Sequence, residues 1–283
     1  MSRDVQTLRV GAAAVSVINV DDIPATLAEW IDLPDSARTP EVAALFEQPF
    51  SVGVQCIYVR LPGLSVLVDV GAAEPKNAAD RAPGYRPPPG ILASLAAQGV
   101  RPDDVEHVVI THGHGDHYNG ATIERGGCLE PVFPNARYYL GRADWEHERR
   151  REALRDPASL DSRTLGVLQQ AGRLVLVEGN RELGSGISIL AAPGESPGHQ
   201  IVRVRSEGQT LYCLGDLFHH PIEVEHLPWM VRWADAESNL HSRQALAEAA
   251  LAEQALLVAT HIPGVGRLER SASGLAWVPW EAS

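Results

Sequence analysis

The stretch Ile110–Gly120 constrains this chain more than any other part of its sequence. It reads ITHGHGDHYNG and places His112, His114, Asp116 and His117 within six residues, directly after the apolar run VEHVVI. Residues two apart on a helix point in different directions, so one helix face could not gather His112 and His114. In a loop, the intervening glycines permit the tight turns that bring all four side chains together. The pattern predicts a buried strand that ends in a loop of clustered polar side chains.

Three further apolar runs begin or end at a polar residue. His199 lies between the turn APGESPG and the strand-like run IVRV, Asp216 follows LYCLG, and His261 follows ALLVAT. A polar group buried at a strand end costs free energy unless it has a partner, so each side chain needs one. Each residue by itself is equally well explained as a structural histidine or a turn aspartate. Together with the first cluster, they favour a site assembled from separate strand ends.

The residue types in this set are those that bind metal ions. Imidazoles and carboxylates that converge are borderline-to-hard ligands and suit zinc. Four ligands from one loop cannot complete two coordination shells, so the distant residues would have to supply the rest. A solvated histidine-rich turn accounts for a single histidine but not for this spacing at a strand end.

The composition is that of a globular protein, and it argues against several kinds of partner. Hydrophobic residues make up 45% and charged residues 21% of the 283 residues, which suits one large α/β domain. The formal net charge of −12 opposes a nucleic-acid partner and an anionic membrane surface, because both need basic groups. Cys56, Cys128 and Cys213 are far apart and form no CxxC pair, which predicts free thiols in a reducing compartment. The sequence has no signal-peptide pattern and no run of about 18 apolar residues, so we expect a cytoplasmic protein.

The first third of the chain contains strands and a segment of different character. Residues 5–20 alternate like a strand, and VQCIYVR and LSVLVDVG read as two strands joined by a Pro-Gly turn. Residues 21–50 hold helical fragments at Ala25–Ile31 and Pro40–Phe46, which predicts a cap or a dimerisation insertion. The proline-rich residues 74–90 are predicted to form an irregular loop.

Helices and strands alternate through the rest of the chain. Helices are expected at Ile91–Gly99, in the charged residues 142–156 and at Asn239–Gln254, and the charged one is expected to be a solvated helix. Short turns connect them to several apolar strand-like runs. Two sheets with helices outside them, in a layered α/β domain, fit this order best. We expect residues 1–283 to form a single domain.

The motifs as a set resemble those of the metallo-β-lactamase superfamily. The resemblance rests on THGHGDH, on the later His199, Asp216 and His261, and on Asp69 in VLVDVG, and it covers about residues 54–265. It implies an αββα sandwich with the metal site between the sheet edges, and it leaves the N-terminal cap-like extension outside the family pattern. By the same resemblance, Asp69 supports the site from behind and is not a ligand.

The resemblance also implies two divalent metal ions, with zinc favoured, and assigns their ligands. His112, His114 and His199 would hold the first ion, Asp116, His117 and His261 the second, and Asp216 would bridge the two.

Several features of the sequence reduce the number of superfamily branches that the chain could resemble. The bridging Asp216 separates this chain from true metallo-β-lactamases, and His114 separates it from flavodiiron-type oxidases, which have Glu there. The net charge of −12 opposes a tRNA-processing nuclease, and the 22 residues after His261 are too few for the helical domain of a glyoxalase II. Quorum-signal lactonases and organophosphorus or aryl-ester hydrolases remain, and residues 215–237 look more like the second group.

Two residues depart from the pattern of these groups. Glu195 stands in GESPGH where the superfamily commonly has the first histidine of GHxPGH, so we expect different hydrogen bonding around the site. His219 stands where the lactonases have a tyrosine, three residues after the bridging aspartate. A histidine can still donate to a developing oxyanion, although His219 and His220 are explained equally well as structural turn residues.

The implied reaction is hydrolysis of a small-molecule ester, lactone or phosphotriester by a metal-bridging hydroxide. Asp116 would be both a ligand and a proton shuttle, and His219 would be the donor in the transition state. Specificity is expected to lie in residues 21–50, 74–90 and 221–235. An apolar-lined cleft there would favour an ester, lactone or aryl substrate, unless the same side chains fill the core or a homodimer interface. These side chains are Trp30, Phe46, Phe50, Tyr85, Trp229, Met230 and Trp233.

Three other functions stay open on the sequence. A persulfide dioxygenase on the same fold would use one iron ion. A measured content of two zinc ions per chain would therefore exclude this function. A thioesterase like glyoxalase II would act on thioesters alone. A binding protein without catalysis would be expected to have lost ligands, whereas all seven are present here.

Overall fold

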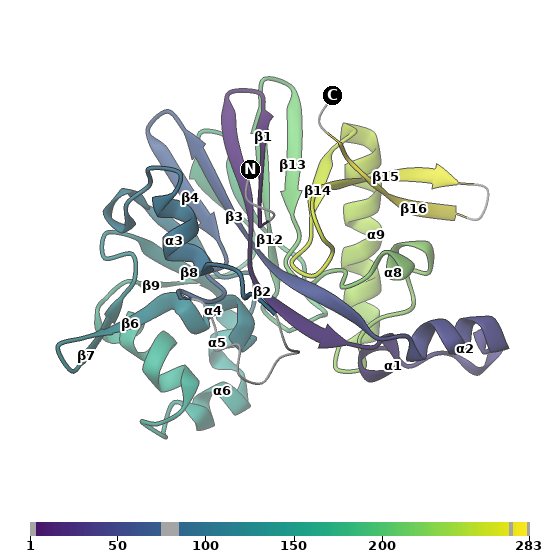
Figure 1. The fold of residues 1–283 in the computed structure, drawn as a ribbon, viewed down its shortest axis with the longest axis horizontal. Helices are drawn as coiled ribbons and strands as arrows, with labels where there is room; N and C mark the ends of the chain where they lie inside the picture. The colour runs from purple at the N-terminus through teal and green to yellow at the C-terminus, as the bar shows by residue number, and fades with distance from the viewer. Residues whose placement is uncertain (1–3, 75–84, 272–273, 282–283) are drawn as a thin grey trace.

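The computed structural model describes residues 4–74, 85–271 and 274–281 as two large sheets packed face to face (Figure 1). The first sheet has the strand order β1-β2-β3-β4-β5-β8-β9, and the second has the order β10-β11-β12-β13-β14-β15-β16. The strands of the first are β1 (Val5–Val10), β2 (Ala13–Ala25), β3 (Phe50–Leu61), β4 (Leu64–Val68), β5 (His107–Val109), β8 (Arg137–Gly141) and β9 (Leu174–Val177). Those of the second are β10 (Arg181–Gly184), β11 (Ile187–Ala191), β12 (Gln200–Ser206), β13 (Gln209–Cys213), β14 (Leu256–Val258), β15 (Gly266–Ser271) and β16 (Gly274–Pro279).

Helices cover the outer face of each sheet (Figure 1). On the first sheet lie α3 (Gly90–Ala96), α4 (Gly115–Tyr118), α5 (Arg142–Glu146), α6 (Glu148–Ala153) and α7 (Val167–Gln170), with the small hairpin of β6 (Thr122–Arg125) and β7 (Cys128–Pro131). On the second lie α8 (Pro221–Glu225) and α9 (Ala236–Glu253). The predicted αββα sandwich is therefore confirmed.

Strand β3 has both faces buried, which explains why its sequence is a nearly continuous apolar run. Ile57 and Val59 point into the cluster between the two sheets, whereas Cys56 and Tyr58 point into the cluster under the outer helices. Neighbouring residues of a strand face opposite sides of the sheet, so a central strand of a four-layer sandwich needs apolar residues at every position. A third cluster packs α9 against the second sheet.

Two expectations about local structure were wrong. Residues 5–20 are not one strand, because the chain reverses between β1 and β2, where Val10 pairs with Ala13. Gly11 has φ +54°, a conformation that glycine adopts without steric cost and that a two-residue hairpin turn requires. An alternating pattern continues across so short a turn, which hides it in the sequence.

The charged residues 142–156 do not form one solvated helix. The chain breaks at His147 into α5 and α6, and Asp144 and Arg150 are buried. The polar partners of these two side chains lie far away in the sequence, so the run of charges carries no sign of their burial. Of the predicted loop 74–90, residues 75–84 lie outside the described part of the chain.

The predicted cap residues 21–50 divide between the sheet and a helical extension. Residues 21–25 continue β2, and Phe50 begins β3. Between them lie α1 (Leu27–Trp30) and α2 (Pro40–Glu47), capped by Thr26 and Thr39, at the end of the sandwich where β2 and β3 reach furthest (Figure 1). Their apolar side chains form a cluster with Ile222 and Trp229, and residue Ile31 pairs with Val231.

Two buried glutamines join the sheets at one edge. The side chain of Gln55 on β3 donates to the carbonyls of Ala259 and Ile262, at 2.6 Å each, and accepts from Gly264 N at 2.7 Å. The side chain of Gln200 at the start of β12 donates to the carbonyl of Ile110 at 2.9 Å. These bonds fix the segments that follow β14 and β5 against the opposite sheet. Among the helices of the described residues, none is long and apolar enough to span a bilayer.

We predict that Gln55→Leu lowers the free energy of unfolding by about 2–4 kcal/mol, because it leaves buried backbone groups without partners. Urea unfolding followed by circular dichroism measures this. The matched control is Gln170→Leu on the exposed end of α7, which should change stability by less than about 0.5 kcal/mol. Equal effects of the two substitutions would contradict the role given to Gln55.

Candidate metal centre

Strand direction brings the predicted residues to one edge of the sandwich. Strands β4 and β5 are parallel, as are β13 and β14, so the carboxyl ends of each pair lie together. Strand β12 runs antiparallel to β13, which puts the start of β12 at the same edge. The residues just beyond these ends are Asp69, the 110–117 segment, His199, Asp216 and His261.

The 110–117 segment is part loop and part helix. His112 and His114 lie in the loop after β5, and α4 begins at Gly115, so that Asp116 and His117 lie on its single turn. The four side chains converge, as the sequence predicts, although half of them do so from a helical turn. His112 and His117 are fully buried, whereas His114 and Asp116 remain partly exposed.

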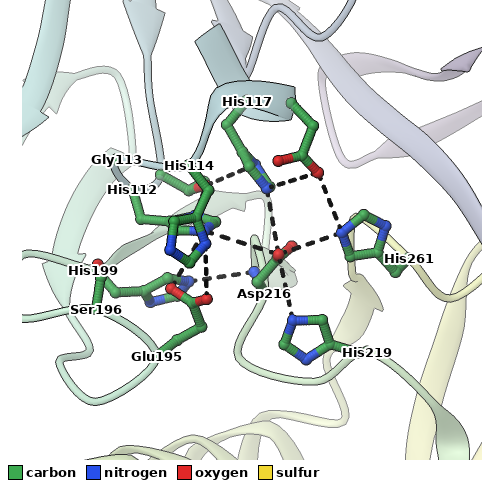
Figure 2. Close-up of polar contacts among 12 residues, drawn as sticks. His112, Gly113, His114, His117, Glu195, Ser196, His199, Asp216, His219 and His261 are labelled. Carbon is green, nitrogen blue, oxygen red and sulfur yellow. Dashed lines mark hydrogen bonds and ion pairs between the residues drawn. The ribbon is translucent and has the colours of Figure 1, made fainter. Parts of the chain in front are cut away.

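The carboxylate of Asp216 lies at the middle of the cluster (Figure 2). Its Oδ2 is 3.2 Å from Nε2 of His117, 3.2 Å from Nε2 of His261 and 3.7 Å from Nε2 of His112. Oδ2 of Asp116 lies 3.5 Å from Nε2 of His117 and 3.4 Å from Nε2 of His261. Asp216 thus touches imidazoles from both halves of the site, and the Asp116, His117, Asp216 and His261 ligand atoms all lie within 4.8 Å of one another.

The supporting hydrogen bonds orient the imidazoles toward this carboxylate. Nδ1 of His117 lies 2.8 Å from Asp69, whose two oxygens also accept from the backbone N–H and hydroxyl of Thr111. Nδ1 of His261 lies 2.8 Å from the carbonyl of Gly53, and Nδ1 of His199 lies 3.0 Å from that of Ala192. With Nδ1 engaged, Nε2 is the atom that faces the cluster, an arrangement common to metal-binding histidines.

The carboxylates and imidazoles of the cluster shift each other's pKa values. Burial opposes the ionisation of Asp216, yet His117, His261 and His219 outweigh it and hold its pKa well below the usual range. Burial likewise opposes protonation of His261, but the carboxylates of Asp216 and Asp116 raise its pKa to about 10. Two carboxylates in a buried site require compensating positive charge, which protons on the imidazoles or a bound cation supply.

The donor atoms of this cluster fit a metal ion. Among the described residues, three buried atoms form no hydrogen bond of acceptable geometry: Nε2 of His117, Oδ1 of Asp216 and Oε2 of Glu195. Nε2 of His117 nevertheless lies 3.2 Å from Asp216, and Oε2 of Glu195 lies 3.2 Å from His112. Buried polar atoms are normally paired, so a group of unpaired nitrogen and oxygen atoms aimed at one place is characteristic of ligands. Imidazole nitrogen and carboxylate oxygen are the donors that zinc prefers in hydrolytic sites.

His199 and Glu195 lie differently with respect to the converging ligand atoms. Nε2 of His199 accepts a hydrogen bond of 3.2 Å from the backbone N–H of Asp216 and lies outside the group of converging ligand atoms. Glu195 does belong to such a group, with His112 and His114. Its fully buried carboxylate points into the cluster beside both imidazoles (Figure 2).

His219 and His220 have different surroundings. His220 caps α8 by accepting from the backbone N–H of Ile222 at 3.2 Å, which is a structural role. His219 is buried, and its Nε2 lies 3.3 Å from Oδ2 of Asp216. Its ring stacks on that of His261, with centroids 5.5 Å apart, so His219 lies at the centre itself.

A buried ion pair holds the loop that carries Asp216 and His219. Arg243 of α9 lies 2.6 Å from Glu223 and donates to the carbonyls of Leu217 and Trp229. Glu223 in turn accepts from the backbone N–H groups of His219 and His220. Burial opposes the ionisation of Glu223, but Arg243 and His219 lower its pKa to about 2.

Asp144 joins the two ligand-bearing loops, a role that no sequence motif indicates. Its buried carboxylate accepts from Gly113 N at 2.7 Å, from Gly198 N at 2.6 Å and from the Ser196 hydroxyl at 2.8 Å. Arg150 donates to the carbonyl of Gly113 and to Tyr118. Both residues come from the stretch that reads as a solvated helix, because nothing local indicates a partner so distant in the sequence.

Two of the predicted aromatic residues face the centre. The ring of Trp30 lies 5.5 Å from those of His219 and His261, and the ring of Trp233 lies 6.1 Å from His219 and 6.2 Å from His114. Phe46 and Trp229 pack against each other inside the helical extension instead. A surface pocket of about 610 Å³ opens beside His114, Glu195 and Trp233.

Comparison with known proteins identifies relatives with hydrolytic names. The family model described as "Metallo-beta-lactamase superfamily" matches residues 51–261. An N-acyl homoserine lactonase of Bacillus cereus is 27% identical over 124 residues, which are 44% of this chain and 42% of that protein. An N-acyl homoserine lactonase of Bacillus thuringiensis is 26% identical over 117 residues, which are 41% of this chain and 40% of that protein. The chain thus spans less than half of the length of these relatives.

Solved structures agree with the fold along the whole chain. AbOPH, a hydrolase in the beta lactamase superfamily, superposes with a TM-score of 0.79 at 16% identity and covers 100% of this chain and 99% of its own. AidC, a dizinc quorum-quenching lactonase in complex with a product, superposes with a TM-score of 0.75 at 19% identity. The superposition covers 99% of this chain and 98% of the AidC chain. At such identities the likeness concerns the fold.

We predict that Asp144→Asn weakens zinc binding about 10–100-fold, because an amide has only one oxygen and can no longer accept from both backbone N–H groups that position the ligand loops. Competition with a coloured chelator measures the dissociation constant. Glu148→Gln, on the exposed face of α6, is the control and should leave it unchanged. A zinc affinity of Asp144→Asn equal to that of the control would show that Asp144 does not position the ligands.

Proposed function

Because the chain belongs to the metallo-beta-lactamase superfamily, we propose that it is a dinuclear metal-dependent hydrolase of a small-molecule ester, lactone or phosphotriester. The observation that carries the proposal is the position of Asp216, whose Oδ2 lies within 3.7 Å of imidazole nitrogens from both halves of the cluster. From this position Asp216 would be able to help hold two cations, one with each set of imidazoles. When bound, a metal pair supplies a water nucleophile of lowered pKa and polarises the oxygen of the bond to be cleaved.

The proposed ligands are divided between two ions. His112, His114 and His199 are assigned to one ion, and Asp116, His117 and His261 to the other. Nε2 of His199 lies 3.2 Å from the backbone N of Asp216 and would have to give up that hydrogen bond to bind the ion. Zinc is the favoured metal, since imidazoles outnumber carboxylates in this set and a dizinc lactonase shares the fold.

Asp116 and His219 are the residues proposed to move and donate protons. The carboxylate of Asp116 is partly exposed and lies at the rim of the cluster, so it can take a proton from the attacking water and pass it to the leaving oxygen. His219 lies on the opposite side of Asp216, buried between Trp30 and Trp233. From there an N–H can donate to the negative charge that develops in the transition state.

The surroundings of the centre favour a substrate with an apolar group. Trp30 and Trp233 form aromatic walls on two sides of His219, and the pocket beside Glu195 offers space for a small molecule. Residues 21–50 act as a cap through Trp30, within a single domain of 1–283. The curated relatives are named as lactonases, which supports an acyl lactone among the candidate substrates.

We predict that Asp216→Ala lowers hydrolysis of every accepted substrate by about 10³-fold or more and reduces the metal content below two per chain. Metal analysis of the purified protein and a screen of lactones, aryl esters and phosphotriesters measure both. Asp103→Ala, at an exposed position far from the cluster, is the control. Retention of all activity by Asp216→Ala would overturn the catalytic proposal. A content of one iron per chain would favour a persulfide dioxygenase. Activity on thioesters alone would favour a thioesterase like glyoxalase II.

The role of His219 is tested by a pair of variants. We predict that His219→Phe lowers kcat about 10²–10³-fold with little change in KM, because the donor is lost while the ring packing is kept. His219→Tyr should retain activity within about tenfold of the wild type, since a phenol can also donate a hydrogen bond. Steady-state kinetics on the best substrate of the screen measures both. An unchanged kcat of His219→Phe would show that His219 is a structural residue.

A further inference from the structure

Glu195 is a buried acid at the centre whose role the hydrolase proposal leaves open. It lies in the turn between β11 and β12, and only 2% of its surface is exposed. A carboxylate is costly to bury unless a charge or hydrogen bonds compensate it. No arginine or lysine among the described residues forms an ion pair with Glu195, so the imidazoles of the centre are the groups that can compensate its charge.

The distances around Glu195 are slightly shorter than those between ligands of one ion. Its Oε2 lies 3.2 Å from Nε2 of His112, and its Oε1 lies 3.0 Å from Nδ1 of His114. The two imidazole nitrogens lie 2.9 Å apart. Two atoms that each lie about 2.1 Å from a tetrahedral zinc ion are separated by about 3.4 Å, so this triangle needs only small adjustments around a cation.

The two oxygens of Glu195 have different environments. Oε1 accepts a hydrogen bond of 2.8 Å from Nε1 of Trp233, which fixes the orientation of the carboxylate. Oε2 is buried and lies 3.2 Å from Nε2 of His112, but it accepts no hydrogen bond of acceptable geometry from the described residues. One anchored oxygen and one free oxygen directed at His112 are what a monodentate carboxylate ligand requires. A carboxylate that only supported a ligand would be bound to an N–H on the far side of an imidazole, as Asp69 is to His117.

We propose that Glu195 is a direct ligand of the metal ion that His112 and His114 hold, an inference that rests on the proposed metal-dependent function. Trp233 is then a positioning residue, which acts through its hydrogen bond to Oε1. A third carboxylate beside Asp116 and Asp216 lowers the formal charge of a dimetal centre by one unit. Carboxylate oxygen is a harder donor than imidazole nitrogen and suits manganese better. The affinity for manganese should therefore depend on Glu195 more than the affinity for zinc does.

The test compares metal binding of the full-length wild type with that of Glu195→Gln, which keeps the size of the side chain and removes its charge. Chelator competition should give a loss of more than about 100-fold for one of two ions, larger for manganese than for zinc. The visible spectrum of the cobalt-loaded variant should change with the loss of a ligand. Glu178→Gln, at an exposed glutamate after β9, is the control and should leave both readouts unchanged.

Trp233→Phe adds a graded test, because it keeps an aromatic ring but removes the N–H that anchors Oε1. We expect a loss of affinity for the same ion of about tenfold, smaller than that of Glu195→Gln. A crystal structure of the metal-loaded wild type decides the question even if the variants do not fold. The expected result is an oxygen of Glu195 about 2.0–2.2 Å from the ion.

The outcomes separate this inference from the proposed function. A wild type that binds no metal would overturn both. A wild type that binds two ions, with affinities and a cobalt spectrum that Glu195→Gln leaves unchanged, would overturn the role of Glu195 alone. A metal-loaded structure with both oxygens of Glu195 beyond coordinating distance would also overturn that role and leave the proposed function standing.

Discussion

The carboxylate of Asp216 is the group on which the arrangement of the centre depends. It lies just beyond β13, in the middle of the second sheet, and its Oδ2 is surrounded by imidazoles from the ends of β5, α4 and β14. An isolated buried carboxylate would be strongly unfavourable, so the fold must keep compensating groups close to it. The low pKa of Asp216 and the raised pKa of His261 are two expressions of this one requirement.

The rest of the molecule supplies the rigidity that such a cluster requires. Gln55 and Gln200 bind the edges of the two sheets together next to the ligand loops. Asp144 joins the loop of His112 to the turn of His199, and the Arg243–Glu223 pair fixes the loop that carries His219. All of these supports are buried polar groups with several partners each. A buried polar network holds one geometry when every member has its hydrogen-bond partners. Networks of this kind around the centre can therefore keep the ligand loops in place.

Selectivity within the superfamily would arise from the residues that depart from its common pattern. Glu195 replaces a histidine and His219 replaces the tyrosine of the lactonase group, and each of them contacts Trp233. The helical extension that contains α1 and α2 brings the ring of Trp30 against His219. These two residues and the two tryptophans therefore contact one another beside the candidate metal centre. A change in metal preference and a change in substrate would then come from the same few side chains.

The sequence by itself determined the family, the αββα architecture and the convergence of the residues at the strand ends. These depend on local signals, namely apolar runs that stop at a histidine or an aspartate and glycines that permit tight turns. Parallel strands end at one edge, so such residues meet wherever the strands pair. The hairpin at Gly11 was not predicted, because the alternating pattern of the two strands continues across the turn.

Only the tertiary structure decided which side chains touch. It placed Glu195 among the ligand atoms and turned Nε2 of His199 toward the backbone of Asp216. It also buried Asp144, Arg150, Glu223 and Arg243 behind the site. The physical reason is that a buried charge is defined by its partner. Those partners lie 31 residues away for Asp144 and Gly113 and 20 residues away for Arg243 and Glu223, so no local pattern records them.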